Sequence, residues 1–339
     1  MPIQLTIIGL GQIGASIGLA LRTPSTSGKQ KQPTNQIKCI GTDTSIEIGH
    51  KAERIGAIDK YIFTLPKAVE NANIVVLAVP VDEVRTTLEQ IASYLQPGSV
   101  VLDTSPVKRS VTQWAEELLP EDRHFVSFTP ALSPHYMEET TSGIDAAHAD
   151  LFQNSIISIT TPTGTDPDAI KLGADLASLL GAKALFSDPT ESDSLTAAGV
   201  QLPKLLAAAL LNATLDEPGW AEGRKVAWRD YAIATGAILR LDENETLGQS
   251  LILNKDNVVR VIDNLIRSLY DLHDAISDSD QAKLKELLDH AQKGRIAWLE
   301  QRLKADWEAV SREASDIPSS GEHLSNLFLG GLGRRQPKK

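Results

Sequence analysis

The chain of 339 residues contains one cysteine and fewer basic than acidic residues. Cys39 cannot form a disulfide within the chain, which favours a reducing compartment. No histidine or second cysteine stands at ligand spacing from it, so we expect no metal site. The 33 basic and 44 acidic side chains give a net charge of −11. This balance argues against nucleic-acid binding, because binding to phosphates needs a basic face.

Two kinds of segment are also missing. The N-terminus enters an apolar run by Ile3, which leaves no room for a signal peptide. No unbroken apolar run approaches the about 20 residues of a membrane span. We therefore expect a cytoplasmic protein that does not contact membranes. The 42% of hydrophobic and 23% of charged residues are otherwise ordinary for a globular protein, and the length suffices for two domains.

The most informative segment that is present is a glycine pattern near the N-terminus. Gly9-x-Gly11-x-x-Gly14 follows directly on a β-rich apolar run and opens a helical pattern. In a dinucleotide site the first glycine permits the turn, the second lets the backbone approach a pyrophosphate, and the third lets helix and strand pack closely. Free N–H groups at the helix N-terminus then face the phosphates. The context predicts a nicotinamide dinucleotide site; the alternative is a glycine-rich turn without a ligand.

Residues 3–188 alternate short apolar runs with helical patterns. This alternation predicts a doubly wound, mostly parallel sheet of the Rossmann type. Several runs are continuous in Val, Ile and Leu, as in strands that are buried on both faces. The expected strands are Leu5–Ile8, Ile37–Gly41, Tyr61–Phe63, Ile74–Val79, Val100–Leu102, Phe125–Phe128, Ile156–Thr160 and Ala184–Phe186. The polar segment Thr23–Gln36 is expected to be a surface loop.

From about residue 190 the strand signals stop and helical patterns take over. They run over 190–217, 220–241, 246–276 and 279–310. In the third, apolar residues alternate spacings of four and three: Val258, Ile262, Leu265, Leu269, Leu272 and Ile276. Such an a/d seam is either the core stripe of a domain helix or a dimer interface. We expect an α/β dinucleotide-binding domain at 1–188, an all-α substrate and dimerisation domain at 189–312, and a disordered tail at 313–339.

Further cofactor contacts are expected where strands end. Asp43 ends the second strand, where a carboxylate accepts hydrogen bonds from ribose hydroxyls and repels the 2′-phosphate of NADP. We therefore expect NAD, with NADP as the alternative; Asp43, Thr44 or Ser45 could instead cap the next helix. Val79-Pro80 ends the fourth strand at the carboxyl edge, where ligands bind in such sheets. The residues expected to bind the cofactor are Gly9, Leu10, Gly11, Gln12, Ile13, Gly14, Asp43, Val79 and Pro80.

The fifth and sixth strands end at the same edge. Lys108 follows the fifth strand and could hold a substrate carboxylate or contact the nicotinamide region. The alternative for this residue is a solvated lysine on the first turn of a helix. Thr129-Pro130 ends the sixth strand. The two segments are candidates for the substrate site, because ligands of open α/β sheets lie at this edge.

With these residues in place, the chain resembles the prephenate/arogenate dehydrogenases of the 6-phosphogluconate-dehydrogenase-like superfamily, over roughly residues 3–310. The resemblance rests on the order and spacing of segments at 9–21, 71–84, 102–108, 125–130, 149–152, 161–169, 202–213 and 228–230, and on the helix that holds Asn254. It implies an NAD(P) domain, a helical dimerisation domain and a homodimer. It also implies oxidation of a ring hydroxyl of prephenate or arogenate with loss of carbon dioxide, toward tyrosine.

The substrate half departs from the family pattern. The family's histidine after the sixth strand hydrogen-bonds the substrate's ring hydroxyl and helps to remove its proton; here that position is Thr129. A threonine hydroxyl can donate or accept a hydrogen bond but is no base near neutral pH. The family's glycine-serine before the valine-lysine is here Ser105-Pro106. The positions of histidines around the first long helix hold Ser192, Gln201 and Lys204.

Two side chains could replace the missing histidine. His135 lies six residues after Thr129, in the loop expected to cover the substrate, and an imidazole suits general-base work. Its alternative is an exposed loop histidine. Lys204 could contact a carboxylate or hydroxyl, and it could serve as an acid or base where burial lowers its pKa. The expected catalytic residues are Thr129, Lys108, Lys204 and His135.

Three functions follow from these observations. The first is a prephenate/arogenate dehydrogenase of tyrosine biosynthesis, which the motif order favours and the missing histidine opposes. The second is an NAD(P)-dependent oxidoreductase of the same fold with another small substrate, which the polar replacements favour. The third is a dinucleotide-binding dimer without catalysis. Turnover with defined substrates separates the three.

Overall fold

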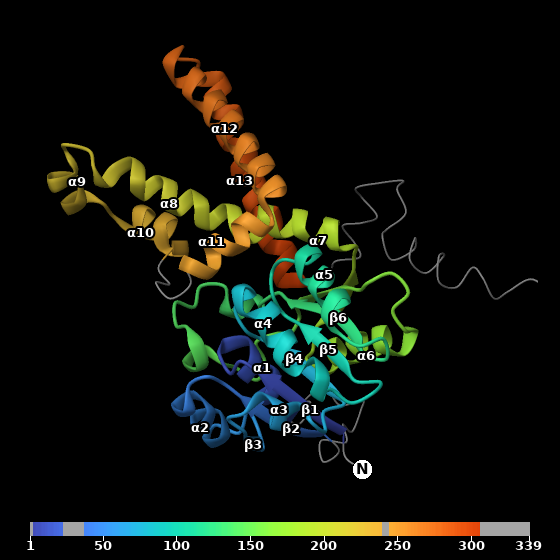
Figure 1. The fold of residues 1–339 in the computed structure, drawn as a ribbon. Helices are drawn as coiled ribbons and strands as arrows, with labels where there is room; N and C mark the ends of the chain where they lie inside the picture. Colours follow the sequence, from blue (N-terminus) through green and yellow to red (C-terminus); the bar gives the residue numbers. More distant parts are fainter. Residues whose placement is uncertain (1–2, 23–36, 239–243, 306–339) are drawn as a thin grey trace, which may run out of the picture.

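The computed structural model describes residues 3–22, 37–238 and 244–305. Its first part is an eight-stranded sheet in the order β3-β2-β1-β4-β5-β6-β7-β8. The strands are β1 (Ile3–Ile8), β2 (Ile37–Thr42), β3 (Lys60–Tyr61), β4 (Ile74–Leu77), β5 (Val100–Asp103), β6 (His124–Pro130), β7 (Ile156–Thr160) and β8 (Lys183–Phe186). Figure 1 shows this sheet below a group of helices. The expected loop at 23–36 and the expected tail at 313–339 lie outside the described residues.

The sheet is mostly parallel, as the sequence predicts. Strands β1 to β6 pair in parallel, whereas β7 runs antiparallel to β6 and β8 runs parallel to β7. The connection from β6 to β7 carries two 3-10 turns, Pro134–Tyr136 and Gly143–Ala146, instead of a crossover helix. A parallel neighbour needs a crossover connection, so the chain returns here as an antiparallel strand.

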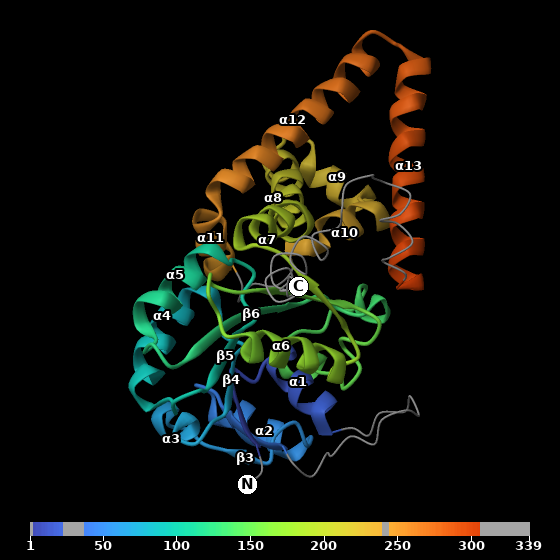
Figure 2. The same ribbon diagram turned by 90° about the vertical axis from the view of Figure 1, so that its right-hand side faces the viewer.

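Helices cover both faces of the sheet. On one face lie α1 (Gln12–Arg22), α2 (Ile46–Arg54) and α6 (Pro167–Leu179); on the other lie α3 (Leu65–Val69), α4 (Val81–Ile91) and α5 (Arg109–Leu118), as Figure 2 shows. Alternate residues of β4 enter the two cores, with Val76 in the first and Val75 in the second. Burial on both faces explains the continuous apolar runs. Cys39, on β2, is a buried free thiol.

The second part is all helical. Its elements are α7 (Pro189–Thr196), a π-helical turn (Ala197–Gln201), α8 (Leu202–Leu215), α9 (Trp220–Val226), α10 (Arg229–Thr235), α11 (Asn244–Leu253), α12 (Lys255–Ser277) and α13 (Gln281–Lys304). Figure 2 shows α12 and α13 as the arms of a hairpin that points away from the sheet. We call residues 3–186 the sheet part and residues 189–305 the helical part. This arrangement confirms the predicted fold class.

Two of the expected long helices are interrupted. The pattern at 220–241 breaks at Trp228, whose backbone is extended between α9 and α10. The pattern at 246–276 breaks at Asn254, between α11 and α12. Asn254 leaves the helical conformation, and its side-chain amide donates to Asp193 O at 2.8 Å. The predictions of unbroken helices were wrong because apolar spacing continues across a break of one or two residues.

The residues of the a/d seam are buried at the start of α12 and exposed toward its end. Val258 is buried and packs in a small core with Ala197 and Val261. Toward the other end of the helix Leu269 and Ile276 are 51% and 63% exposed. The reading as a core stripe is therefore confirmed for the start of the helix. The reading as a dimer interface stays a prediction for its end.

One helical stretch, Pro189–Leu215, is long and apolar enough to cross a membrane by length and composition alone, and 17% of its apolar window is buried. The expectation that no segment reaches this length was wrong, because it considered only unbroken apolar runs. The stretch includes the buried polar residues Asp193 and Gln201. Both bond to neighbouring elements, as is usual in a helix of a folded domain.

Candidate functional site

The loop between β1 and α1 lies where the strand order reverses, between β1 and β4. Gly9 has a left-handed φ of +90°, and a Cβ there would lie 2.4 Å from Ala78 O. A Cβ on Gly14 would lie 2.0 Å from Gly9 O. Neither distance is tolerated, so both positions require glycine. Gly11 differs, because a Cβ there would meet nothing within 4 Å.

The residues of this loop fit a dinucleotide. The first helical hydrogen bond of α1 runs from Ala15 N to Gly11 O at 3.0 Å. The N–H groups of Gln12, Ile13 and Gly14 precede it and have no acceptor within the helix. Such N–H groups attract an anion, which is supported by the helix dipole. The open space at Gly11 therefore lies where a pyrophosphate could approach the backbone.

Asp43 ties the glycine loop to the end of β2. Its Oδ2 accepts a hydrogen bond from Leu10 N at 2.8 Å, and its Oδ1 accepts one from Ser45 N at 2.8 Å. The side chain of Leu10 is fully buried. Ser45, not Asp43, caps α2, because its hydroxyl accepts from Ile48 N at 3.3 Å. A carboxylate has about four acceptor positions, so the half-buried Asp43 keeps room for ribose hydroxyls. Its ribose contact stays a prediction.

Val79 and Pro80 lie beside the same loop. Strand β4 ends at Leu77, two residues earlier than expected, and Ala78 N donates to Ile8 O at 2.8 Å. Val79 is half-buried against Gly9, and Pro80 is the N-cap residue of α4. The segment thus forms the β4 side of the edge at which the glycine loop stands. Its cofactor contact stays a prediction.

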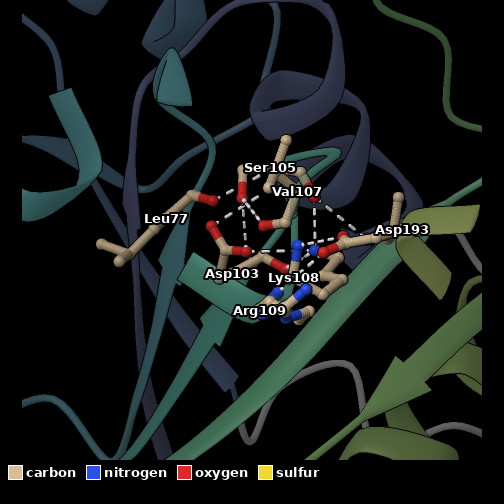
Figure 3. A network of polar contacts seen from close by, with 9 residues as sticks. Leu77, Asp103, Ser105, Val107, Lys108, Arg109 and Asp193 are labelled. Carbon is tan, nitrogen blue, oxygen red and sulfur yellow. Dashed lines mark hydrogen bonds and ion pairs between the residues drawn. The ribbon is translucent and has the colours of Figure 1, made fainter. Parts of the chain in front are cut away.

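Lys108 is part of a buried polar cluster after β5 (Figure 3). Its side chain is 1% exposed, and its Nζ donates to Asp103 Oδ2 at 3.1 Å and to Ser105 O. Ser105 Oγ donates to the same Asp103 oxygen at 2.7 Å. Burial lowers the pKa of the Lys108 ammonium, and the charge of Asp103 opposes that shift. A substrate contact and a solvated lysine both require an accessible side chain, so the structure corrects both expectations.

Asp193, on α7, joins this cluster to the helical part. Its Oδ1 accepts a hydrogen bond from Lys108 N at 2.5 Å, and its Oδ2 accepts one from Arg109 N at 3.1 Å. The carboxylate therefore caps the N-terminus of α5, as Figure 3 shows. Burial raises the pKa of the Asp193 carboxyl, and the two N–H bonds oppose this rise. Asp193 could not be predicted from the sequence, because a contact between residues 85 positions apart leaves no local pattern.

Further polar contacts hold Asp193 in place. Asn254 Nδ2 donates to Asp193 O at 2.8 Å and to Gln201 Oε1 at 2.9 Å. Gln201 Nε2 in turn donates to Ser250 Oγ at 2.7 Å. All four side chains are at most 4% exposed. We call Asp103, Ser105, Lys108, Asp193, Gln201, Ser250 and Asn254 the joint network.

The remaining candidate residues lie at different distances from this network. Thr129 is the penultimate residue of β6, is half-buried, and donates through Oγ1 to Ser105 O at 3.1 Å. The structure thus brings Thr129 and Lys108 together around one carbonyl oxygen. His135 is exposed on a 3-10 turn, with its ring edge-on to Tyr136 at 5.0 Å. Lys204 lies half-buried on the first turn of α8. The catalytic roles of these residues stay predictions.

The segment between β6 and β7 is held against α1 by groups that the sequence analysis missed. His148 N donates to Ser16 Oγ at 3.0 Å, and the His148 ring stacks on Tyr136 at 4.3 Å. Tyr136 OH donates to Asp150 Oδ1 at 2.5 Å. Burial and the bond to Asp150 raise the pKa of Tyr136 to about 12. Among the described residues, no group of three or more His, Cys, Asp or Glu side chains could hold a metal ion.

Comparisons with known proteins agree with this geometry. A family profile described as "Prephenate dehydrogenase, nucleotide-binding domain" matches residues 27–186. The match begins after the glycine loop, so the interpretation of that loop as a dinucleotide site rests on the geometry of the loop itself. The chain is 30% identical to the prephenate dehydrogenase of Bacillus subtilis over 215 residues, 63% of this chain and 54% of the relative. It therefore spans about half of that relative's length.

Other relatives are covered more fully. The chain is 26% identical to the cyclohexadienyl dehydrogenase of Zymomonas mobilis over 298 residues, 87% of this chain and 95% of the relative. Among solved structures, Aquifex aeolicus prephenate dehydrogenase with hydroxyphenyl propionate and NAD+ superposes with a TM-score of 0.73 at 22% identity, covering 88% and 98% of the two chains. Synechocystis arogenate dehydrogenase gives 0.69 at 22%, covering 87% and 100%. These likenesses confirm the fold.

The glycine loop predicts different results for two alanine substitutions. Gly14→Ala places a Cβ against Gly9 O, so we expect the free energy of unfolding to fall by about 1–3 kcal/mol. Gly11→Ala places a Cβ in open space, so we expect a change within about 0.5 kcal/mol. Urea denaturation followed by circular dichroism measures both. Equal losses for the two variants would contradict the loop geometry.

The buried ion pair predicts a large effect of removing its cation. Lys108→Met leaves Asp103 buried without a counter-charge, so we expect the free energy of unfolding to fall by about 3–5 kcal/mol. Lys171→Met is the matched control, because it breaks an exposed pair with Asp175 and should leave the urea midpoint unchanged. Lys108→Met/Asp103→Asn should recover part of the loss. A Lys108→Met midpoint equal to that of the control would show that the ammonium is solvated.

Proposed function

We propose an NAD-dependent dehydrogenase activity for this chain, which belongs to the prephenate/arogenate dehydrogenase family. The proposed reaction oxidises the ring hydroxyl of prephenate or arogenate with loss of carbon dioxide, in tyrosine biosynthesis. The observation that carries the proposal is the glycine loop. Gly9 and Gly14 have no room for a side chain, whereas Gly11 faces open space beside the start of α1.

The chain's own residues have distinct roles in holding NAD. The N–H groups at the start of α1 bind the pyrophosphate. The free acceptor positions of Asp43 bind the ribose hydroxyls and disfavour the 2′-phosphate of NADP. The strand order reverses between β1 and β4, and Val79 and Pro80 lie on the β4 side of this point. They therefore lie along the nicotinamide half of the cofactor. Bound NAD+ supplies the hydride acceptor.

Thr129 has a limited chemical role in this proposal. Its hydroxyl carries one proton, which it donates to Ser105 O. It can therefore only accept a hydrogen bond from a substrate hydroxyl, through an oxygen lone pair. A threonine does not take up a proton near neutral pH, so Thr129 orients the substrate hydroxyl and leaves proton removal to another group. His135 and Lys204 are the candidates for that step.

A second candidate function follows from the same residue. The resemblance to the family predicts a histidine where this chain has Thr129, and the imidazole of His135 is exposed on a neighbouring turn. An oxidoreductase of the same fold that acts on another small hydroxy acid or imine would not need the family's histidine. Thr129 donates to Ser105 O, and the Ser105 hydroxyl donates to Asp103. These ordered contacts support a site that is altered but intact, rather than one that has been lost.

We also propose that the chain divides into two domains between residues 188 and 189. We propose further that two copies form a homodimer through the helical part. Large apolar side chains of the helical part are exposed in the single chain: Val226, Trp228, Ile233, Ile252, Leu269, Tyr270, Ile276 and Leu303. A second copy that covers them would bury this surface. A cytoplasmic location is supported by the buried free thiol of Cys39, which suits a reducing compartment.

Turnover assays test the proposed activity. Purified protein with NAD+ and either prephenate or arogenate should produce NADH. Gly11→Ala should weaken NAD+ binding at least about tenfold, because its methyl group fills the space next to the pyrophosphate. Gly248→Ala is the control, because its Cβ also meets nothing within 4 Å but lies on α11. Folded, NAD+-bound protein that oxidises neither compound would reject the activity and leave the second candidate.

Cofactor choice tests Asp43 separately. Asp43→Ala should weaken NAD+ binding about tenfold and NADP+ binding less, because the carboxylate contacts the ribose hydroxyls and repels the 2′-phosphate. The dissociation constants of both cofactors, measured by titration calorimetry, give the preference of each variant. An equal loss for both cofactors would mean that Asp43 only supports the glycine loop through Leu10 and Ser45.

A further inference from the structure

We propose that Asp193, a residue of the helical part, is a positioning residue for the nicotinamide end of the cofactor site. It acts through the β5–α5 loop, residues 104–108, whose backbone it holds. The inference rests on the NAD-dependent function proposed above. It assigns to the helical part a role in cofactor binding that the glycine loop does not provide.

The cap on α5 does not come from the side chain of its own N-cap residue. The N-cap residue of this helix is Lys108, whose backbone is helical and whose side chain makes no capping bond. The N–H groups of Lys108 and Arg109 instead donate to Asp193, at 2.5 and 3.1 Å. A buried N–H group without an acceptor is unfavourable, so the position of the loop depends on this carboxylate. The cap of a helix in the sheet part thus comes from α7.

The β5–α5 loop is hydrogen-bonded to residues of both neighbouring strands. Thr104 N and Thr104 Oγ1 both donate to Leu77 O, at 3.0 Å each. Thr129 Oγ1 donates to Ser105 O at 3.1 Å. The loop is therefore fixed between the end of β4 and the end of β6, at the carboxyl edge of the sheet. Leu77 is also the residue before the Ala78-Val79-Pro80 segment that faces the glycine loop.

The direction of a bound dinucleotide across the sheet edge follows from the position of Asp43. Asp43 lies at the end of β2, on one side of β1, and it marks the adenosine half. The nicotinamide half must then extend to the other side of β1, over β4 and β5. The β5–α5 loop borders that half and not the adenosine half. A shift of the loop should therefore change the binding of the nicotinamide end alone.

Asp193 is itself held in place by buried hydrogen bonds. Its side chain is 1% exposed, and its carbonyl oxygen accepts from Asn254 Nδ2 at 2.8 Å. Asn254 stands at the break between α11 and α12 and also bonds to Gln201. The carboxylate cannot follow the loop if the loop moves. It acts as a fixed point that sets the loop relative to the helical part.

Two ligands test this inference directly. ADP-ribose occupies only the adenosine and pyrophosphate positions, whereas NAD+ also needs the nicotinamide position. Asp193→Ala should raise the dissociation constant of NAD+ about tenfold and leave that of ADP-ribose within about twofold, by titration calorimetry. Asp193→Asn keeps one acceptor oxygen and should give the same pattern with a smaller change for NAD+. It serves where the alanine variant does not fold.

Asp188→Ala is the matched control. Asp188, like Asp193, is an aspartate that caps a helix. It caps α7, the helix that it precedes, by accepting from Thr190 N and Glu191 N at 2.8 and 3.0 Å. It should change neither dissociation constant. Equal weakening of both ligands by Asp193→Ala, or no change in either, would overturn the proposal, because a merely structural residue gives one of these results.

A second readout separates this inference from the proposed function. If the unaltered protein binds neither ligand, the NAD-dependent function fails. Amide hydrogen exchange of the same variants then decides the positioning role. Faster exchange confined to Thr104–Arg109 in Asp193→Ala supports it. Unchanged exchange there, or faster exchange throughout the chain, overturns it.

Discussion

The carboxylate of Asp193 on the N-terminus of α5 is the contact on which the relation between the two parts of the molecule depends. It joins a helix of the sheet part to the first helix of the helical part through one buried and one partly buried hydrogen bond. Three charged groups, Asp103, Lys108 and Asp193, are buried within this small region. Charges away from water are tolerated only when they are paired and hydrogen-bonded, so each group fixes the position of the others.

This constraint reaches the edge where the proposed site lies. The ends of β4, β5 and β6 are connected through Leu77, Ser105 and Thr129 by hydrogen bonds to carbonyl oxygens. The glycine loop is fixed in a different way, by close packing of Gly9 and Gly14 and by the bond from Leu10 to Asp43. The adenosine half of the site is thus shaped within the sheet part, whereas the nicotinamide half also depends on the helical part.

The residues differ in how far the sequence alone could predict them. The glycine pattern and the strands were predictable, because backbone sterics and two-sided burial leave local patterns such as the continuous run at Ile74–Leu77. The burial of Lys108 was not, since its partner Asp103 and the cap from Asp193 appear only once the chain has folded. The break at Asn254 was hidden for the same reason, because its amide bonds to residues of α7 and the π-helical turn.

A crystal structure of the protein with NAD+ tests the central claim most directly. The account predicts the pyrophosphate against the N–H groups at the start of α1, the ribose hydroxyls on Asp43, and the nicotinamide beside the β5–α5 loop, with Lys108 still buried and Asp193 still on α5. A dinucleotide bound elsewhere, or a loop that separates from Asp193 with Lys108 turned toward the cofactor, would contradict it.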